Sequence, residues 1–486
     1  MLFSEPAFLF LFLPVLLWTH WLIPRRLSNL LLAVVSLGFY AWGEKEYVVI
    51  MAASILLNYV AGRGVASSRA QTVRRVWLVV AVVGNLSILA FFKYADFIAR
   101  NLNLLLDKLG AGTFEPMDIH LPIGISFFTF QSMSYVIDTY RRRTVVQTNP
   151  VNLALYVSLF PQLIAGPIVR YETIARQITH RVLSSALFES GVKRFIVGLA
   201  KKMIIANALA FPADQIFQLP ADQRTMPIAW LGILCYTLQI YFDFSGYSDM
   251  AIGLGRMFGF RFRENFRYPY IARSVTEFWR RWHISLSSWF RDYLYIPLGG
   301  SRGSRWQTYR NLMLVFLLCG LWHGANWAFV AWGLYHGLFL VIERMGFSRL
   351  IQRCWIPLQH LYAMLVVMIG WVFFRVATGP LDRANPLEFG LGYCKSLFGW
   401  QVAPESIRSV EEYLSAYLGF VLLAGIVGST EMARSSRIAA MRWTRGRRYW
   451  RALVRAVSQF LYFLVLCYCI LLIGSDSHNP FIYFQF

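Results

Sequence analysis

Charged side chains are scarce in this sequence. Only 15% of its 486 residues are charged, whereas 57% are hydrophobic and 17% are aromatic. A water-soluble protein of this length needs more charge to cover its surface, so the composition excludes the ordinary soluble class. It predicts a polytopic membrane protein.

Cysteine motifs are also absent from the sequence. The six cysteines are scattered and form no CxxC pair: Cys235, Cys319, Cys354, Cys394, Cys467 and Cys469. No HExxH motif occurs either, so neither a zinc site nor a disulfide framework is predicted. We interpret the cysteines as small core residues and expect no metal and no tightly bound cofactor.

Acidic residues are fewer than basic ones, which leaves a net charge of +22. The basic residues lie in short loops between apolar stretches, notably at 63–75, 141–143 and 433–455. This distribution lacks the basic face that nucleic-acid binding requires, and it follows the positive-inside rule for cytoplasmic loops. It predicts that both termini lie outside the cytoplasm and that the first apolar segment is an uncleaved helix.

Apolar stretches that approach the roughly 30 Å of a bilayer core recur along the chain. They are Pro6–Ile23, Leu30–Trp42, Val48–Ala61, Trp77–Phe92, Pro122–Ile137, Ile228–Phe242, Asn311–Leu321, Trp327–Ile342, Leu361–Phe374, Tyr413–Val427 and Val454–Ile473. Several are short or interrupted, so we expect tilted, broken and re-entrant helices around a central cavity. The predicted fold class is an all-α polytopic membrane protein with one domain over 1–486. Within it, 1–120 are frame helices, 121–345 are the functional core, and 346–486 are C-terminal helices and a tail.

Polar side chains are concentrated in the apolar segments of the middle third. The stretch 121–143 carries Gln131 among several hydroxyl residues, and the run 159–170 carries Gln162 between the helix breakers Pro161 and Gly166. Polar groups in a membrane helix favour packing between helices, whereas a broken run is typical of a segment that lines a cavity. We therefore favour interhelical packing for 121–143 and a cavity-lining segment for 159–170.

Two carboxylates, Asp243 and Asp249, lie in the apolar stretch 241–260. Six residues correspond to about 240° of helical rotation, so the two share no face unless the helix breaks at Gly246. The nearby glycines do not fit GxGxxG and follow no strand, which excludes a dinucleotide site. Cation binding and proton relay are open alternatives, but ion pairing with one of three arginines is favoured: Arg280, Arg281 or Arg291.

The stretch 277–300 alternates aromatic and basic residues. It contains Trp279, Trp282 and Trp289 together with Arg280, Arg281 and Arg291. This pattern predicts an interfacial helix with snorkelling arginines. The same guanidinium groups are a suitable platform for a phosphate-bearing ligand, and the two interpretations are compatible.

A histidine, His323, lies in the sequence GLWHGANW at 320–327. An imidazole at membrane depth needs a partner, and Gly320 and Gly324 allow a substrate or a second helix to approach it. Asn326, three residues on, is expected on the same helical side, whereas His336 is thirteen residues away and forms no metal pair with it. Because neither metal nor cysteine chemistry is indicated, His323 is predicted to be a general base that deprotonates a hydroxyl.

These motifs carry a resemblance over most of the chain. YFDFSGYSDMAIGLG, SVTEFWRRWHISLSSWFRDYLYIPLGG and GLWHGANW, with FLFLFLPVLL, LPIGISFFTFQSMSYVIDTYR and FPQLIAGPIVR, resemble the membrane-bound O-acyltransferase (MBOAT) family. The similarity is to its bacterial branch, typified by alginate O-acetyltransferases. The resemblance implies a helical bundle with a tunnel that reaches His323 from both membrane faces.

The resemblance also implies site residues. The signature histidine of the family falls on His323, and its second active-site position falls on His283. The tunnel-lining residues that it implies are Gln131, Gln162, Asp243, Ser245, Trp322 and Asn326. The tail NPFIYFQF resembles a C-terminal motif whose tyrosine is proposed to carry the acyl group. That role would fall on Tyr483, with an interfacial anchor as the alternative.

The activity that the resemblance implies is O-acetyl transfer across the bacterial inner membrane, with both termini in the periplasm. Acetyl-CoA would be the cytoplasmic acyl donor, its phosphates near Arg280, Arg281 or Arg291. A periplasmic acetyltransferase partner protein would then complete the O-acetylation of an alginate-like exopolysaccharide or bacterial cellulose. Alternative acceptors are peptidoglycan, or teichoic acid in a D-alanylation system. Outside the enzymes, a membrane transporter or a scaffold is possible, although the inverted repeat typical of transporters is not visible.

Overall fold

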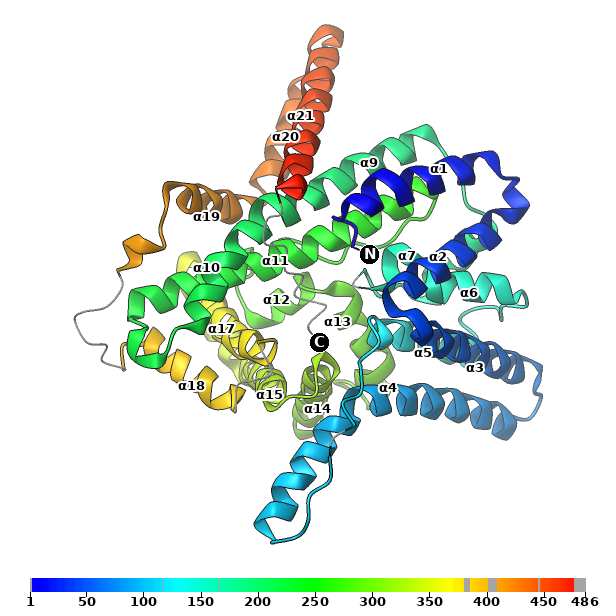
Figure 1. The fold of residues 1–486 in the computed structure, drawn as a ribbon, viewed down its shortest axis with the longest axis horizontal. Coiled ribbons are helices and arrows are strands. Elements are labelled where there is room, and N and C mark those ends of the chain that lie inside the picture. The colour runs from blue at the N-terminus through cyan, green and yellow to red at the C-terminus, as the bar shows by residue number, and fades with distance from the viewer. Residues whose placement is uncertain are drawn as a thin grey trace. The chain divides into compact units, whose positions relative to one another are not determined.

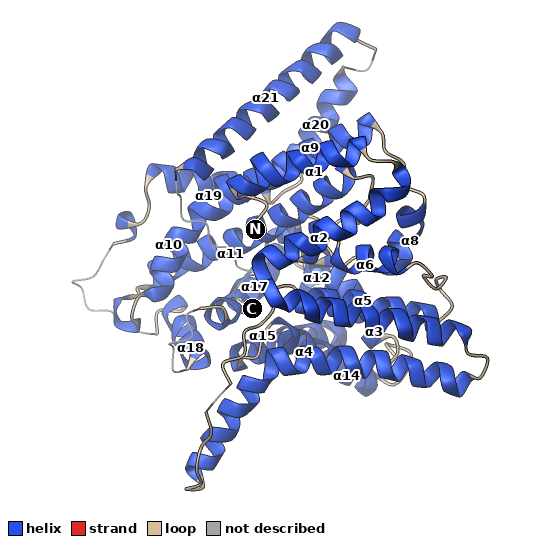
Figure 2. Cartoon of the chain, turned by 45° about the vertical axis from the view of Figure 1, so that its right-hand side comes forward, coloured by secondary structure: helices blue, strands red, loops and turns tan. Residues whose placement is uncertain are grey.

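A computed structural model of the chain describes residues 2–115, 117–164, 166–379, 385–400, 409–444 and 446–475. The regular elements of these ranges are all helical, and no strand occurs among them (Figure 2). The prediction of an all-α polytopic membrane protein is therefore confirmed.

Six helices in the described ranges are long and apolar enough to cross a membrane. They cover Arg25–Ser67, Gln71–Lys108, Ser185–Gln218, Met226–Met257, Ile356–Ala377 and Arg448–Gly474. All of them overlap stretches expected from hydropathy except Ser185–Gln218, which the sequence analysis missed. Four basic residues interrupt its apolar sequence: Lys193, Arg194, Lys201 and Lys202.

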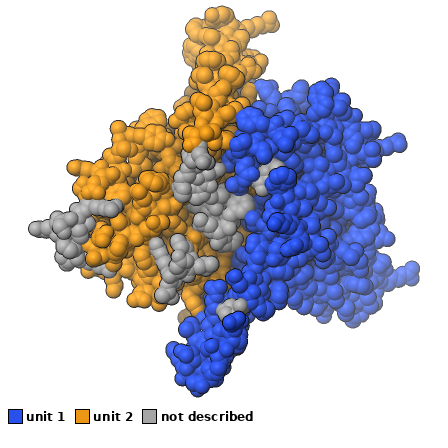
Figure 3. Space-filling view, in the orientation of Figure 1, with its two compact units in different colours: residues 1–192, 251–263 blue, residues 193–250, 264–486 orange. Residues whose placement is uncertain are grey.

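The chain divides into two compact units (Figure 3), and each is described by itself. The first comprises residues 1–192 and 251–263. Its elements are η1 (Ala7–Phe12), α1 (Leu13–Leu22), η2 (Arg25–Leu27), α2 (Ser28–Glu44), η3 (Lys45–Tyr47), α3 (Val48–Ser67), α4 (Gln71–Lys108), α5 (Ile125–Tyr140), α6 (Pro150–Ser158), α7 (Phe160–Leu163) and α8 (Tyr171–Thr179). The prediction that the whole chain forms one membrane domain stays a prediction.

Helices α3, α4 and α5 lie side by side in both ribbon views (Figures 1 and 2). Between the first two, the buried side chains of Asn58 and Asn85 exchange two amide hydrogen bonds of 3.1 and 2.9 Å. Buried amides stabilise a helix pair when their hydrogen bonds are satisfied, so this exchange fixes α3 against α4.

The second unit comprises residues 193–250 and 264–486. Its elements are α9 (Ser185–Ala200), η4 (Lys201–Ala206), α10 (Asn207–Gln218), η5 (Ala221–Gln223), α11 (Met226–Met257), η6 (Pro269–Ile271), α12 (Val275–Arg281), α13 (Ile284–Phe290), η7 (Arg291–Tyr295), α14 (Arg305–His323), α15 (Trp327–Ile342), η8 (Glu343–Phe347), α16 (Ser348–Arg353), α17 (Ile356–Ala377), α18 (Pro386–Leu397), η9 (Val410–Glu412), α19 (Ala416–Gly428), α20 (Met432–Trp443) and α21 (Arg448–Gly474). The first turns of α9 and the end of α11 belong to the first unit.

Helix α11 is the buried centre of this second unit. In its apolar 18-residue window 89% of the residues are buried, whereas the corresponding value for α21 is 6%. An exposed apolar helix such as α21 is suited to contact with lipid. Helix α11 is suited instead to carry polar groups in the protein interior, where other side chains can satisfy them.

A single carboxylate, that of Glu343 in η8, holds the start of α12. Its oxygens accept hydrogen bonds from the backbone N–H of Val275 at 2.7 Å and of Thr276 at 2.9 Å. They also accept from the Thr276 hydroxyl at 2.6 Å and from the Tyr362 hydroxyl at 3.1 Å. Because the first N–H groups of a helix lack partners within the helix, this buried carboxylate fixes the position of α12.

Candidate active site

His323 is the last residue of α14. The helix begins with a capping box and ends where Gly324 adopts an extended conformation. Only 4% of His323 is exposed, and its ring centroid lies 4.9 Å from that of Trp322, 5.0 Å from Trp332 and 5.1 Å from Phe374. The imidazole therefore lies in an aromatic enclosure that excludes bulk water.

The backbone around His323 is held by close contact between α14 and α15. A Cβ added at Gly320 would lie 2.4 Å from the carbonyl oxygen of Phe329, and one added at Gly333 would lie 2.3 Å from that of Phe316. No other residue fits at such distances, so glycine is required at both positions. Gly320 therefore allows a second helix, α15, to approach closely, which is one of the two interpretations made from the sequence.

Asn326 does not lie on the same helix as His323, so that prediction was wrong. Helix α14 ends at His323, and Asn326 caps the next helix, where its Oδ1 accepts a hydrogen bond of 2.8 Å from the Ala328 N–H. Asparagine is a preferred N-cap because its side chain replaces a missing helical acceptor. The Gly324 break explains why the helical spacing did not apply.

His336, on α15, is separated from His323 by an aromatic ring. The Trp332 ring centroid lies 5.0 Å from that of His323 and 5.2 Å from that of His336. Among the described residues no three histidine, cysteine or carboxylate side chains gather in a way that would hold a metal ion. The site is therefore built from histidine, tryptophan and amide groups.

The stretch 277–300 is not one interfacial helix, and that prediction was wrong. Helix α12 ends at Arg281, and His283 has a φ of 42° before α13 begins. The three tryptophans are 8%, 3% and 6% exposed, so they lie in the protein interior: Trp279, Trp282 and Trp289. The left-handed turn directs successive aromatic residues inward, where an uninterrupted amphipathic helix would have placed them on one surface.

The left-handed turn at His283 is fixed by Asn265, which the sequence analysis missed. Asn265 Oδ1 accepts hydrogen bonds from the N–H of Ser285 at 3.1 Å and from its hydroxyl at 2.8 Å. The same oxygen lies 3.2 Å from His283 Nδ1, and Asn265 Nδ2 donates to the Ser248 hydroxyl at 3.1 Å. Because an amide oxygen only accepts, Nδ1 of His283 carries the proton and Nε2 carries the lone pair.

The structure brings His283, Trp322 and His323 together in the second unit. The Trp322 ring centroid lies 6.3 Å from that of His283 and 4.9 Å from that of His323. Phe244 of α11 packs edge-on against His283 at 4.6 Å. Two residues forty positions apart in the sequence thus lie against one indole ring, and their catalytic roles stay a prediction.

Asp243 and Asp249 form ion pairs with basic residues of the helix that the sequence analysis missed. The Nζ of Lys202 lies 2.7 Å from Asp243, and that of Lys201 lies 2.8 Å from Asp249. Arg194 approaches Asp249 to 2.6 Å. The predicted pairing with the arginines of 277–300 was wrong, and α11 continues through Gly246 without the break that was considered. Ser245 accepts a 3.3 Å hydrogen bond from Lys201.

The three arginines predicted to meet a phosphate differ in their partners. Arg281 pairs with Glu277 at 2.7 Å, and Arg291 pairs with Asp292 at 2.6 Å. Burial alone would raise the pKa of Glu277, but the Arg273 N–H and the Arg281 guanidinium lower it. Among the described residues only Arg280 of this trio is exposed with no carboxylate partner, so its guanidinium is the available one.

Gln131 and Gln162 belong to the first unit, where both contact Tyr156. Gln162 Nε2 donates to the Tyr156 carbonyl at 2.6 Å, and the Tyr156 hydroxyl donates to the Gln131 carbonyl at 3.1 Å. Both glutamines are fully buried. Within the described ranges neither side-chain amide atom of Gln131 has a hydrogen-bond partner, nor does Gln162 Oε1. Tyr483 lies outside the described residues.

Known proteins resemble the chain over most of its length. Residues 51–379 match the sequence model of the membrane-bound O-acyltransferase family, MBOAT. The chain is similar to the probable alginate O-acetylase AlgI of Azotobacter vinelandii, with 51% identity over 377 residues that cover 77% of this chain and 75% of that protein. It is 42% identical to the probable alginate O-acetylase AlgI of Pseudomonas putida over 505 residues, 100% of both chains. The peptidoglycan O-acetyltransferase of Helicobacter pylori is 37% identical over 435 residues, 82% of this chain and 80% of that protein.

Proposed function

The chain belongs to the membrane-bound O-acyltransferase family, and we propose that this O-acetyltransferase for an alginate-like polysaccharide takes acetyl-CoA as its donor and His323 as its base. The observation that supports this proposal is the aromatic enclosure of His323 beside the oriented ring of His283. The enclosure excludes water, which would otherwise compete with the acceptor hydroxyl for the acetyl group.

In the proposed reaction, His323 accepts the proton of the attacking hydroxyl, whose oxygen forms an ester bond with the acetyl carbon. The carbon–sulfur bond breaks, and CoA leaves as a thiolate that takes the proton back from the imidazolium. Because α14 ends at His323, the negative end of the helix dipole favours the positive charge between these steps. A positioned base of this kind contributes about 10²- to 10⁴-fold to the rate.

Trp332 and His283 are the other groups that we place in this reaction. Trp332 is 1% exposed, and within the described part of the chain its Nε1–H has no acceptor. Buried indole N–H groups normally have a partner, so we assign this donor to the oxyanion that forms on the acetyl oxygen. The Nε2 lone pair of His283 is suited to accept a hydrogen bond that orients the hydroxyl.

The proposal also covers how acetyl-CoA is bound and how the acetyl group reaches the polymer. Arg280, exposed and without a carboxylate partner among the described residues, is the guanidinium that we assign to the phosphates of CoA. We further propose an inner-membrane location with both termini in the periplasm, and a periplasmic partner that delivers acetyl groups to the polymer. Tyr483 is then either the acyl carrier or an interfacial anchor.

Mass spectrometry of the purified chain after incubation with acetyl-CoA tests this proposal. The wild type is compared with His323→Ala, Tyr483→Phe and, as a matched control, His180→Ala, which removes an exposed histidine. An acetyl group on Tyr483 that is lost in the first two variants supports the tyrosine relay. Release of CoA without an acetyl adduct, abolished only by His323→Ala, supports His323 as the base and Tyr483 as an interfacial anchor. If folded His323→Ala released CoA at the full rate, the assignment of His323 as the base would be refuted.

The alternative acceptors can be distinguished by gene deletion, because only the true acceptor polymer should lose its acetyl groups. Identity is 42–51% to the alginate O-acetylases above, against 37% to the peptidoglycan enzyme. This order favours the alginate-like polysaccharide. Deleting the gene should therefore remove O-acetyl signals from the exopolysaccharide NMR spectrum and leave peptidoglycan acetylation unchanged. A transporter would release no CoA in the assay above.

A further inference from the structure

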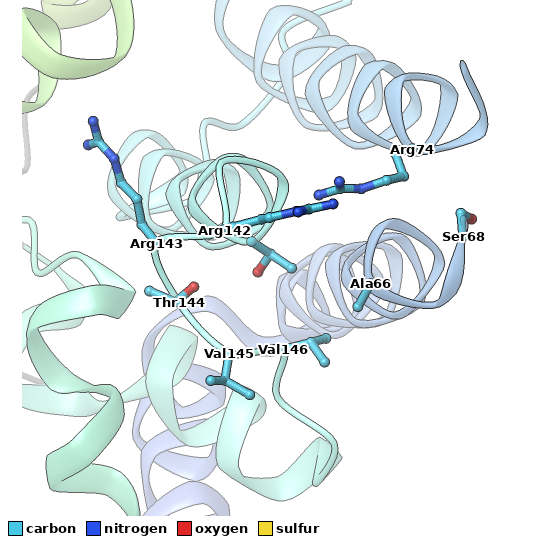
Figure 4. A pocket seen from close by; sticks show the side chains of 9 residues that line it. Ala66, Ser68, Arg74, Arg142, Arg143, Thr144, Val145 and Val146 are labelled. Carbon is cyan, nitrogen blue, oxygen red and sulfur yellow. The ribbon is translucent and has the colours of Figure 1, made fainter. Parts of the chain in front are cut away.

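A basic pocket lies in the first unit, and residues of that unit alone line it. It has a volume of about 430 Å³, and its lining includes Arg74, Arg142, Arg143, Thr144 and Val145. The end of α3, the start of α4 and the loop that follows α5 form it (Figure 4). The basic segments 63–75 and 141–143, which the charge pattern predicts to be cytoplasmic, thus meet at one place.

Arg74 is the buried member of this pocket. It is 7% exposed, and its Nε and Nη2 donate to the carbonyl oxygens of Val65 at 3.2 Å and of Tyr140 at 2.9 Å. Its guanidinium also lies 5.5 Å from the centre of the Tyr140 ring. These contacts fix the orientation of the cation but supply no negative charge. A buried guanidinium normally has a carboxylate or another anion beside it.

The pocket contains positive charge that no carboxylate of the described residues balances. Arg74, Arg142 and Arg143 all line it, no acidic side chain does, and none of the three has a carboxylate partner within the described ranges. Figure 4 shows Arg74 and Arg142 extending toward one another, with Arg143 directed away. The hydroxyl of Thr144 is buried there, and no described group bonds to it. Two converging guanidinium groups match the oxygen atoms of a phosphate group.

The flank of the pocket is apolar and exposed. On α4, Val73 is 44% exposed and Val76 is 59% exposed, on either side of Arg74, and Val145 at the pocket is 84% exposed. In a membrane-spanning helix such as α4, exposed valines face acyl chains, whereas Val145 lies in the loop after α5. Cytoplasmic basic pockets between membrane helices are suited to bind anionic lipid headgroups, because the guanidinium groups meet the phosphate at the depth where the chains begin.

We propose that this pocket binds the phosphate of an anionic phospholipid, with Arg74 and Arg142 on the phosphate oxygens and the acyl chains along the apolar flank of α4. A soluble phosphate compound is the other source of the same chemistry. The site is independent of the transferase centre, so it stands or falls separately from the proposed base.

Native mass spectrometry of the full chain, purified and delipidated in a neutral detergent, tests the proposal. The probes are phosphatidylglycerol, diacylglycerol, which lacks the phosphate, and inorganic phosphate. Arg142→Gln removes an exposed pocket cation, and Arg75→Gln removes an exposed cation from the neighbouring position outside the pocket. We expect phosphatidylglycerol binding by the wild type and Arg75→Gln, and binding about ten-fold or more weaker in Arg142→Gln, the effect of losing a charge-assisted hydrogen bond.

Three results would contradict the proposal. Equal losses in Arg142→Gln and Arg75→Gln would mean that only general surface charge attracts the lipid. Binding of diacylglycerol as strong as that of phosphatidylglycerol would overturn phosphate recognition. Displacement of the lipid by millimolar inorganic phosphate, which then binds in an Arg142-dependent way, would keep the phosphate site but overturn the lipid as its occupant. Arg74→Gln, purified in folded form, should show the same loss as Arg142→Gln.

Discussion

Breaking the buried ion pair between Lys202 and Asp243 should destabilise the protein strongly, whereas replacing both residues should not. The two side chains are 3% and 1% exposed and lie 2.7 Å apart. Removing one partner from a buried ion pair costs about 3–5 kcal/mol, because the other charge stays buried. Replacing both by apolar residues of similar volume is often neutral or stabilising. We therefore expect Lys202→Met and Asp243→Leu each to lower the free energy of unfolding, and the double variant to recover it.

A neighbouring lysine supplies the matched control. Lys201 pairs with Asp249 at 2.8 Å, but Asp249 also has Arg194 at 2.6 Å. Lys201→Met removes a charge-assisted hydrogen bond to Asp249 and a 3.3 Å one to Ser245 but leaves Asp249 paired with Arg194. It should therefore cost about 1.5–3 kcal/mol, less than Lys202→Met. The measurement is the unfolding free energy in mixed micelles over the full double-variant cycle. A double variant as unstable as either single one, or equal losses from Lys201→Met and Lys202→Met, would refute the reasoning.

The same variants decide what Asp243 does. If it only holds α11 against the preceding helix, the stable double variant should release CoA from acetyl-CoA at a rate close to that of the wild type. If it lines the path of a substrate, as the resemblance implies, the double variant should be folded but slow. Stability and activity are thus separated in one set of proteins.

Three further predictions concern the positioning of the site. Asn265→Leu removes the acceptor for His283 Nδ1–H, and we expect CoA release to fall about 5- to 10-fold with the protein still folded, the effect of losing one hydrogen bond. An unchanged rate would show that the Asn265 hydrogen bonds are only structural. Trp332→Phe keeps an aromatic ring but removes the indole N–H that has no acceptor among the described residues. The turnover rate should fall about 10²-fold with little change in KM. A rise in KM alone would contradict the oxyanion role. Glu343→Gln removes the negative charge that caps α12, and it should lower the free energy of unfolding by about 1–3 kcal/mol. An unchanged midpoint of thermal unfolding would contradict this expectation.

Much of the fold could be predicted from the sequence because lipid imposes two simple conditions. Spans must be apolar and helical, and both conditions appear directly in composition and in run length. The breaks were harder to place. The turn at His283 depends on Asn265, eighteen residues earlier in the sequence, and nothing in the local pattern of aromatic and basic residues indicates it. The end of α14 at His323 could have been suspected from Gly324, and the expectation for Asn326 failed because that signal was not used.

The missed helix and the wrong partners of the two carboxylates have one physical cause. Basic residues interrupt the apolar sequence of Ser185–Gln218, and two carboxylates that are costly at membrane depth interrupt that of α11. Together the two segments neutralise each other. Adjacent residues of an α-helix, such as the two lysines, differ in direction by about 100° around the helix axis. Residues six apart, such as the two aspartates, differ by about 120° in the opposite sense. Lys201 and Lys202 can therefore reach Asp249 and Asp243 from one neighbouring helix, as the distances of 2.8 and 2.7 Å show. Hydropathy scores each segment separately and so reads each charge as an isolated cost. A membrane sequence with two opposite charge pairs at such spacings is better read as a helix pair, in which the charges specify the contact.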